Sequence, residues 1–192
     1  MSGPLDQSVR DAREALDRFI ADERNLARLD AVARRMAGCL GAGGRILAIG
    51  NGGSMCDAMH FCEELTGRFR DDRRPLAAIA CSDPTHLTCV ANDYGFEHVF
   101  SRWVEAMGRE GDVLVAISTS GRSANVVKAV EVARASKIRV VGLLGKDGGV
   151  LAELCDDAWI VPGATSDRIQ EIHMIILHTL VEGIEGHLAG LG

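Results

Sequence analysis

Short apolar runs alternate with longer helical patterns along most of the chain, and this alternation limits the fold more than any other feature. The runs that we predict to be strands are residues 45–49, 76–80, 113–117, 139–144 and 158–161. Continuous apolar runs are typical of parallel strands that are buried on both faces. The helical patterns between them begin near Ser54, Thr85, Ser123 and Gly149, with a further apolar stretch at 99–107. The order predicts an α/β fold of three layers around a doubly wound, five-stranded parallel sheet.

Helical patterns also occupy both ends of the chain. Apolar residues recur at helical spacing from Val9 to Ile20 and from Leu26 to Leu40, with charged residues between them, which predicts two amphipathic helices. Residues 167–188 form one long helical pattern after the last predicted strand. At 192 residues the chain has the length of one α/β domain. We therefore predict a single domain over residues 1–192, in which residues 1–43 are an N-terminal helical extension.

Composition and charge exclude several classes of partner. The formal net charge is −6, which argues against nucleic acid as a ligand, because proteins that bind its phosphate backbone present a basic face. The sequence has no run of about eighteen apolar residues and no basic segment followed by an apolar one. We expect no membrane segment and a soluble, cytoplasmic protein. The six cysteines lack the close spacing of a metal site and are interpreted as reduced core residues.

A loop rich in hydroxyl groups follows the predicted strand at 113–117. It reads Ser118-Thr119-Ser120-Gly121-Arg122-Ser123 and leads into a helical pattern. Hydroxyls beside the free backbone N–H groups of a helix N-terminus favour a bound anion, because the helix dipole is positive there. The lysine of a nucleotide P-loop is absent, which favours a sugar monophosphate over a nucleoside triphosphate. A capped turn between strand and helix explains the same residues equally well.

A second loop, Gly50-Asn51-Gly52-Gly53-Ser54, follows the predicted strand at 45–49. Its glycines allow the backbone to approach a ligand closely, and Ser54 is expected to cap the next helix. The G-x-G-x-x-G spacing of a dinucleotide site is not met, so we expect no nucleotide cofactor. Ligands of doubly wound sheets bind beyond the carboxyl ends of the strands, which is where both loops fall.

Two predicted helices carry side chains that are suited to acid/base or metal chemistry. His60 and Glu64 are four residues apart and project from one helical face, where they could share a proton or bind a metal ion. Spacing alone favours an exposed ion pair for them. On the last helix Gln170, Met174 and His178 lie along one stripe among apolar residues. Taken alone, His178 is interpreted as a core histidine with satisfied hydrogen bonds.

Five motifs, in this order along the chain, resemble those of the sugar isomerase (SIS) domain family. They are Gly50 to Ser54, His60 to Arg68, Asn92-Asp93, Ile117 to Gly121 and Asp167 to His173. The resemblance covers nearly the whole chain and is closest to the members that isomerise sedoheptulose 7-phosphate. It implies the flavodoxin-like strand order 2-1-3-4-5. It also implies a homotetramer with active sites at the subunit interfaces, in which residues 1–43 pack against other subunits.

The resemblance assigns roles to individual positions. It implies that the sugar phosphate is held by Ser118, Thr119, Ser120 and Ser123. The remaining substrate-binding positions that it implies are Asn51, Gly52, Gly53, Ser54, Glu64, Asn92, Asp93, Asp167 and Gln170. Glu64 and His178 match the acid/base pair. In some members one zinc ion per subunit is bound, at the positions of His60, Glu64, Gln170 and His178.

The implied activity is the conversion of D-sedoheptulose 7-phosphate to D-glycero-D-manno-heptose 7-phosphate, the first step of nucleotide-activated heptose biosynthesis. A ketose becomes an aldose through an enediol, so one base must remove a proton from carbon while other groups handle protons on O1 and O2. We expect Glu64 to act at carbon and His178 to be its acid/base counterpart, although the sequence also allows the reverse assignment. The alternative is a non-catalytic SIS-domain regulator that binds sugar phosphates or proteins, such as the one that associates with a bacterial replication initiator. Such relatives lack the acid/base pair.

Three departures from the family pattern stand out. Met55 occupies a position where histidine is common in close relatives, and Arg122 replaces a small polar residue in the phosphate loop. Arg122 either adds positive charge to the phosphate site or points to solvent. Residues 163–166, which precede the last helix, are also atypical, so the resemblance does not predict which residues cover the far part of the sugar.

Overall fold

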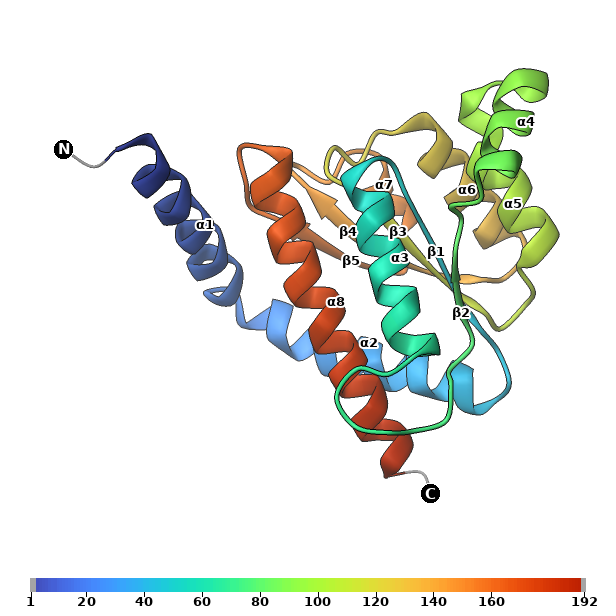
Figure 1. Ribbon diagram of the computed structural model, residues 1–192, viewed down its shortest axis with the longest axis horizontal. Coiled ribbons are helices and arrows are strands. Elements are labelled where there is room, and N and C mark those ends of the chain that lie inside the picture. The colour runs from blue at the N-terminus through green and yellow to red at the C-terminus, as the bar shows by residue number, and fades with distance from the viewer. Residues whose placement is uncertain (1–2, 191–192) are drawn as a thin grey trace.

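The sheet has five parallel strands in the order β2-β1-β3-β4-β5 (Figure 1). The structure is a computed structural model, which describes residues 3–190; the ends of the predicted domain, residues 1–2 and 191–192, lie outside the described residues. The strands are β1 (Ile46–Gly50), β2 (Ala78–Ala80), β3 (Val113–Ser118), β4 (Arg139–Gly145) and β5 (Asp157–Val161). The predicted α/β class and the flavodoxin-like order are confirmed.

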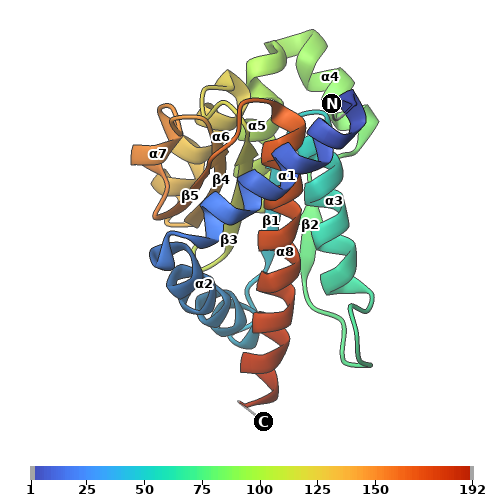
Figure 2. The same ribbon diagram turned by 90° about the vertical axis from the view of Figure 1, so that its left-hand side faces the viewer.

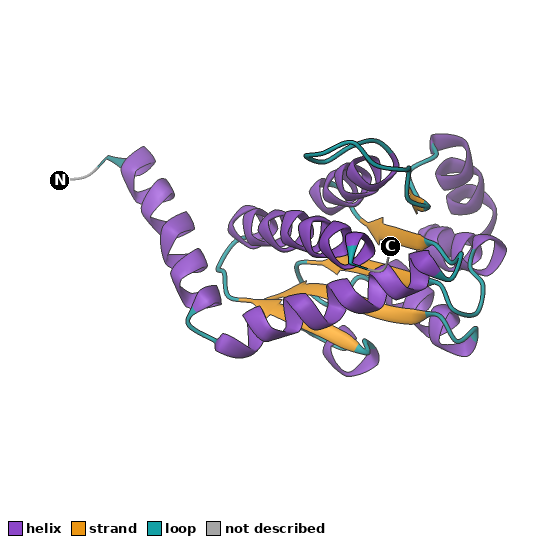
Figure 3. Cartoon of the chain, turned by 90° about the horizontal axis from the view of Figure 1, so that it is seen from below, coloured by secondary structure: helices purple, strands orange, loops and turns teal. Residues whose placement is uncertain are grey.

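Helices cover both faces of this sheet, as Figure 3 shows from below. They are α1 (Pro4–Ile20), α2 (Glu23–Gly41), α3 (Gly53–Thr66), α4 (Pro84–Tyr94), α5 (Val99–Met107), α6 (Ala124–Ala135), α7 (Leu151–Leu154) and α8 (Ser166–Ala189), with a 3-10 turn η1 (Phe96–His98) before α5. In β1, Ile46 packs with α2, α3 and α8, whereas Leu47 packs with α5 and α6 on the other face. Side chains alternate along each strand and therefore contribute to two apolar cores, one on each face of the sheet. The sheet and its two helical layers form the predicted three-layer arrangement.

The two N-terminal helices differ in how they meet the domain. α2 packs along α8 and contributes Val32, Met36 and Leu40 to one of the cores. α1 projects away from the sheet (Figure 1), toward the viewer in Figure 2, and buries Ala15 and Phe19 near its end. The apolar side chains of its first turns, among them those of Leu5 and Val9, are exposed. The amphipathic pattern of α1 therefore lacks a partner over much of its length in one chain.

Strand β2 is shorter than the predicted 76–80. Leu76 is buried, but its N–H donates to the carbonyl oxygen of Leu65 at the end of α3 and not to the sheet. Pro75, directly before it, has no N–H to donate. The contact with α3 therefore delays the strand to Ala78.

Among the helices of residues 3–190, none combines the length and apolar character that spanning a membrane requires.

The carboxyl ends of β1 and β3 lie side by side at the middle of the sheet. Gly50, the last residue of β1, pairs with Ile117 of β3. From β1 the chain turns into α3 on one face, and from β3 into α6 on the other. Such a switch point opens a crevice beyond the strand ends, where ligands bind in open α/β sheets. The two loops that were selected in the sequence therefore meet at the expected place.

Candidate functional site

The loop after β1 is tied to the start of α6 by a pair of amide side chains. Asn51 donates from Nδ2 to Oδ1 of Asn125 at 2.9 Å, and Asn125 donates back to Oδ1 of Asn51 at 2.8 Å. Asn125 is buried, and its Oδ1 also accepts from the backbone N–H of Val126. This reciprocal pair fixes the loop after β1 against the loop after β3. Asn125 was not predicted from the sequence, although its place in the first turn of a helix after a hydroxyl-rich loop was an available signal.

Ser54 does not cap α3, contrary to our expectation. The N-cap is Gly52, whose φ of 56° is a conformation that glycine adopts readily, and α3 begins at Gly53. Ser54 lies inside the first turn, where its buried hydroxyl accepts a hydrogen bond from Nε2 of Gln170 at 3.2 Å. Ser54 and Gln170 thus join the first turns of α3 and α8.

The loop after β3 is arranged by its own hydroxyl groups. Ser118 Oγ accepts from the N–H of Gly121 and lies 3.3 Å from Ser123 Oγ, and Ser120 Oγ accepts from the N–H of Arg122. Thr119 Oγ1 lies 3.1 Å from Ser166 Oγ at the start of α8. These bonds turn the loop around the N-terminus of α6, where anions are favoured.

Gly121 allows this loop to pack against the turn before α7. Its φ is 62°, and a Cβ atom there would lie 1.9 Å from the carbonyl oxygen of Gly148. A larger residue would therefore push the two loops apart.

Arg122 does not add free charge to the loop, because its guanidinium forms two hydrogen bonds of 2.6 Å with the carboxylate of Asp147. This ion pair lowers the pKa of Asp147.

The carboxylate of Glu64 lies between two imidazoles. Its Oε1 is 3.2 Å from Nε2 of His60, one turn earlier on α3, and 3.4 Å from Nε2 of His178 on α8. The two rings meet edge to face with centroids 5.2 Å apart, and Phe69 stacks on His178 at 5.9 Å. The glutamate side chain is only 9% exposed, against 47% for His60 and 41% for His178. A carboxylate so deeply buried argues against the exposed ion pair that spacing alone favoured.

These three side chains fit a divalent metal ion. One ligand atom from each of His60, Glu64 and His178 lies within 4.8 Å of the others. Nitrogen and oxygen ligands at about 2.0–2.2 Å from zinc lie roughly 3.3–3.6 Å apart in a tetrahedral site, close to the distances between Glu64 and the two imidazoles. The other carboxylate oxygen, Oε2, is buried without a hydrogen-bond partner among residues 3–190. A cation would compensate for that deficit.

Gln170, the fourth expected metal ligand, does not join this cluster within one chain. Its amide is engaged with Ser54 near the start of α3. It lies eight residues before His178 on α8, which is about 12 Å along the helix axis. One chain therefore assembles three of the four expected ligands.

Asp57, which is half-buried, and His173, which is buried, are polar residues for which no role was predicted from the sequence. Asp57 is one turn before His60 on α3; its Oδ2 is buried without a partner in the described chain, and burial raises the pKa of its carboxyl to about 6. His173 is fully buried on α8, and its Nε2 donates to the carbonyl oxygen of Leu144 at 3.0 Å. Burial lowers the pKa of this imidazole to about 4. The core histidine of α8 is thus His173, whereas His178 is half-exposed.

The remaining expected substrate residues lie at exposed positions. Asn92 and Asp93 are next to each other near the end of α4, where the amide of Asn92 donates to the carboxylate of Asp93. Asp167 is in the first turn of α8 and forms an ion pair with Arg168. Hydrogen bonding from Thr165 lowers the pKa of Asp167.

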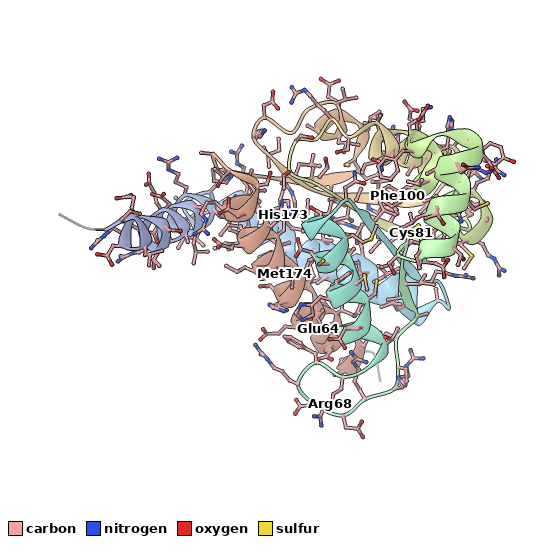
Figure 4. All side chains as sticks on the ribbon, turned by 45° about the horizontal axis from the view of Figure 1, so that its top comes forward. Glu64, Arg68, Cys81, Phe100, His173 and Met174 are labelled. Atoms are coloured by element: carbon pink, nitrogen blue, oxygen red, sulfur yellow. The ribbon has the colours of Figure 1, made fainter. Side chains whose placement is uncertain are left out.

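The two halves of the candidate site are far apart within one chain. Both α3 and α8 begin at the edge of the sheet where the loops meet, and each helix then extends away from that edge (Figure 1). Glu64 is ten residues beyond Ser54, about 15 Å along α3 at 1.5 Å per residue. Figure 4 shows Glu64 toward the end of that helix. The hydroxyl-rich loop therefore lies near the start of α3, whereas the Glu64 cluster lies near the end of that helix.

The chain is similar to known proteins in both sequence and fold. A sequence model of the SIS domain matches residues 9–145. The phosphoheptose isomerase of Fusobacterium nucleatum is 56% identical over 94% of this chain and 93% of its own length. A solved phosphoheptose isomerase from Neisseria gonorrhoeae is 43% identical, with a TM-score of 0.81 over 95% of each chain. Another, from Francisella tularensis, is 36% identical, with a TM-score of 0.88 over 96% of this chain and all of that one.

Proposed function

The chain belongs to the SIS domain family and, within it, to the phosphoheptose isomerases, and from this premise we propose that it converts D-sedoheptulose 7-phosphate to D-glycero-D-manno-heptose 7-phosphate. The observation that carries the proposal is the placement of Glu64 against His178 from two separate helices. A binding module needs no such buried acid/base pair. The non-catalytic alternative is therefore not favoured. The product would enter the synthesis of nucleotide-activated heptoses.

Glu64 and His178 supply the proton transfers in this proposal. Moving hydrogen between C1 and C2 requires a base at carbon and a group that exchanges protons with O1 and O2. Glu64 is the base at carbon, because a buried carboxylate is an acceptor with little competing water. His178 is the partner at oxygen, because its half-exposed ring lies beside Glu64 and can both donate and accept.

The loop from Ser118 to Ser123 holds the phosphate in this proposal. Its support is the position of these hydroxyls at the N-terminus of α6, with the loop braced by Asn51 and Asn125 on one side and by Gly121 on the other. Binding at the far end of the substrate orients the reacting carbons. Further polar contacts are assigned to the sugar hydroxyls, at Asn51, Gly52, Gly53, Ser54, Asn92, Asp93, Asp167 and Gln170.

We further propose that each active site combines two copies of the chain. An extended seven-carbon sugar phosphate measures about 10 Å from C1 to phosphorus, at roughly 1.2 Å per bond as in an extended polypeptide. This is shorter than the distance of about 15 Å between the start of α3 and Glu64. A second copy that brings its Glu64 cluster to the loop of the first would close the gap. The exposed apolar residues Met59 and Ile175, on α3 and α8, support burial of this surface in a homotetramer.

Zinc is the metal that we assign to the cluster of His60, Glu64 and His178. Its donor set of two imidazoles and one carboxylate is that of catalytic zinc sites with an open position. When bound, zinc supplies Lewis acidity that stabilises negative charge on the enediol oxygens. Gln170 would complete the set only from another copy of the chain or after rearrangement, because its own amide is bound to Ser54.

The free state of the cysteines favours a reducing compartment, and we propose that the protein is located in the cytoplasm. All six are free thiols in the structure. Burial raises the pKa of Cys62 and Cys81 to about 12, so these thiols are unreactive core groups. Reduced cysteines of this kind are usual in cytoplasmic proteins.

Incubation with sedoheptulose 7-phosphate tests the proposed activity. The purified chain is expected to form the aldose heptose 7-phosphate, followed by NMR, and to leave unphosphorylated sedoheptulose unchanged at the same concentration. Fructose 6-phosphate, a ketose phosphate with a shorter carbon chain, is tested in parallel. Failure to convert sedoheptulose 7-phosphate in the presence of added Zn²⁺ would overturn the assignment.

A further inference from the structure

Arg73 lies in the loop after α3 and contacts the last turn of that helix. Its Nη2 donates to the carbonyl oxygen of Glu64 at 2.7 Å, and its Nη1 donates to the carbonyl oxygen of Leu65 at 2.8 Å. α3 ends at Thr66, so both oxygens belong to the last turn, where carbonyl groups lack partners inside the helix. A cation at this end also interacts favourably with the helix dipole. Arg73 therefore closes the turn that carries Glu64.

The same guanidinium group also reaches α8. Its Nε donates to Oε1 of Glu185 at 2.7 Å. Glu185 follows His178 by seven residues, which is about two helical turns, so the two side chains leave α8 on the same side. The side chains of Arg73 and Glu185 are only 16% and 20% exposed. One planar group thus connects the backbone of Glu64 to the helix that carries His178.

We propose that Arg73 is a positioning residue for the isomerisation, which holds the last turn of α3 against α8 and so fixes Glu64 beside His178. The inference rests on the proposed function of that pair. A helix end without partners frays, and Glu64 is the third-last residue of α3. Misplacement of a reacting group by about 1 Å can lower a rate about 100-fold. Arginine suits this role, because its rigid fork of donors binds several acceptors at once.

The chain provides a matched control one turn earlier on α8. Arg70, from the same loop, forms an ion pair of 2.9 Å with Glu182, but the two side chains are 62% and 57% exposed. Glu182→Gln removes a charge pair that links the same loop and helix without touching the carbonyl groups of α3. Its effect measures the loss of an exposed ion pair alone.

The experiment compares Arg73→Ala, Arg73→Lys, Glu185→Gln and Glu182→Gln in the full-length chain, with circular dichroism to verify folding at the assay temperature. Steady-state kinetics give kcat and KM, and hydrogen exchange by mass spectrometry reports on residues 61–67. Arg73→Ala is expected to lower kcat about 10- to 100-fold and to leave KM within about two-fold, because the phosphate loop is distant. Arg73→Lys is expected to recover only part of kcat, because one ammonium group cannot bridge both carbonyls and Glu185. Glu185→Gln should fall between Arg73→Ala and the wild type.

Hydrogen exchange separates this inference from the proposed function. Exchange in residues 61–67 should be at least about 10-fold faster in Arg73→Ala than in Glu182→Gln, whether or not the wild type isomerises sedoheptulose 7-phosphate. If the wild type is inactive and exchange changes as stated, the connection between the helices is real and the proposed function has failed. A folded Arg73→Ala variant with wild-type kcat, or a Glu182→Gln variant that loses as much kcat, would overturn the role of Arg73.

Discussion

Nε2 of His178 lies 3.4 Å from Oε1 of Glu64, across the contact between α8 and α3. The two residues are distant in the sequence and meet only because both helices pack on one face of the sheet. His60 approaches the same oxygen at 3.2 Å, so a single carboxylate atom is shared by two imidazoles. Acid/base chemistry and metal binding therefore depend on the same three side chains.

Zinc content tests the metal assignment. Protein purified without chelators or a metal-affinity tag should contain about one zinc per chain by elemental analysis, because the cluster supplies three ligands with suitable spacing. His60→Ala should lower this content well below one half, because two protein ligands hold zinc poorly. The control is His187→Ala, which removes a histidine that is bound to Asp30 on the surface. Full activity in zinc-free wild-type protein would show that the metal is dispensable.

Substitution of Asn125 tests the phosphate site. Asn125→Asp keeps the size of the side chain but cannot donate to Asn51, and it places a negative charge at the start of α6. A carboxylate there is favourable for the helix but repels a bound phosphate. We expect KM for the sugar phosphate to rise at least about 10-fold, which corresponds to about 1.4 kcal/mol. Asn125→Ala, which adds no charge, should raise KM less; equal KM values for Asn125→Asp and the wild type would place the phosphate elsewhere.

Mixing two variants that are each impaired in a different half of the site, and assaying them at a substrate concentration well below the wild-type KM, tests whether active sites are shared between copies. Asn125→Asp impairs the phosphate loop and Glu64→Gln removes the base, and these residues belong to different halves of the candidate site. Unfolding and refolding an equimolar mixture should restore about one quarter of wild-type activity, because random assembly pairs an intact loop with an intact cluster at that frequency. Each variant refolded alone is the control. No recovery in a mixture that contains mixed oligomers by native mass spectrometry would mean that one chain holds the whole site.

Burial of His173 predicts how stability depends on pH. The pKa of its imidazole is about 4 in the folded chain, whereas an unfolded chain takes up the proton near pH 6.5. The neutral ring therefore contributes stability that is present above pH 6.5 and lost as the pH falls toward 4. Between pH 7 and pH 5 the loss is about 2 kcal/mol. Urea unfolding at both pH values, at fixed protein concentration, should show a smaller change for His173→Gln than for the wild type; the same change in both would exclude His173 as the cause.

Fold and site differ in how far the sequence could predict them. The strands follow from short apolar runs, whereas their order was predicted from the resemblance to a family. Only β2 was misjudged, because the bond from Leu76 to Leu65 depends on the packed end of α3. Glu64 and His178 could be paired only through the resemblance to a family, since spacing relates residues within a helix and not between helices. Asn125 was missed for the same reason: its role depends on Asn51, which lies in the loop after β1, far from Asn125 in the sequence.

Ser54 shows a different limit of sequence reasoning. Serine after glycines is a common N-cap, so the prediction followed from local preference. The structure instead uses Gly52 at positive φ and turns the serine hydroxyl toward Gln170 on α8. A contact with a distant helix thus outweighed the local preference.

Solvent exchange during turnover tests the central claim most directly. Sedoheptulose 7-phosphate is incubated in deuterated water with the wild type and with Glu64→Gln, and the C1 and C2 signals are followed by NMR. The account predicts that the wild type forms the aldose with deuterium at C2, whereas folded Glu64→Gln converts the substrate at least about 100-fold more slowly. A Glu64→Gln variant that forms deuterated aldose at the wild-type rate would contradict the assignment of Glu64 as the base.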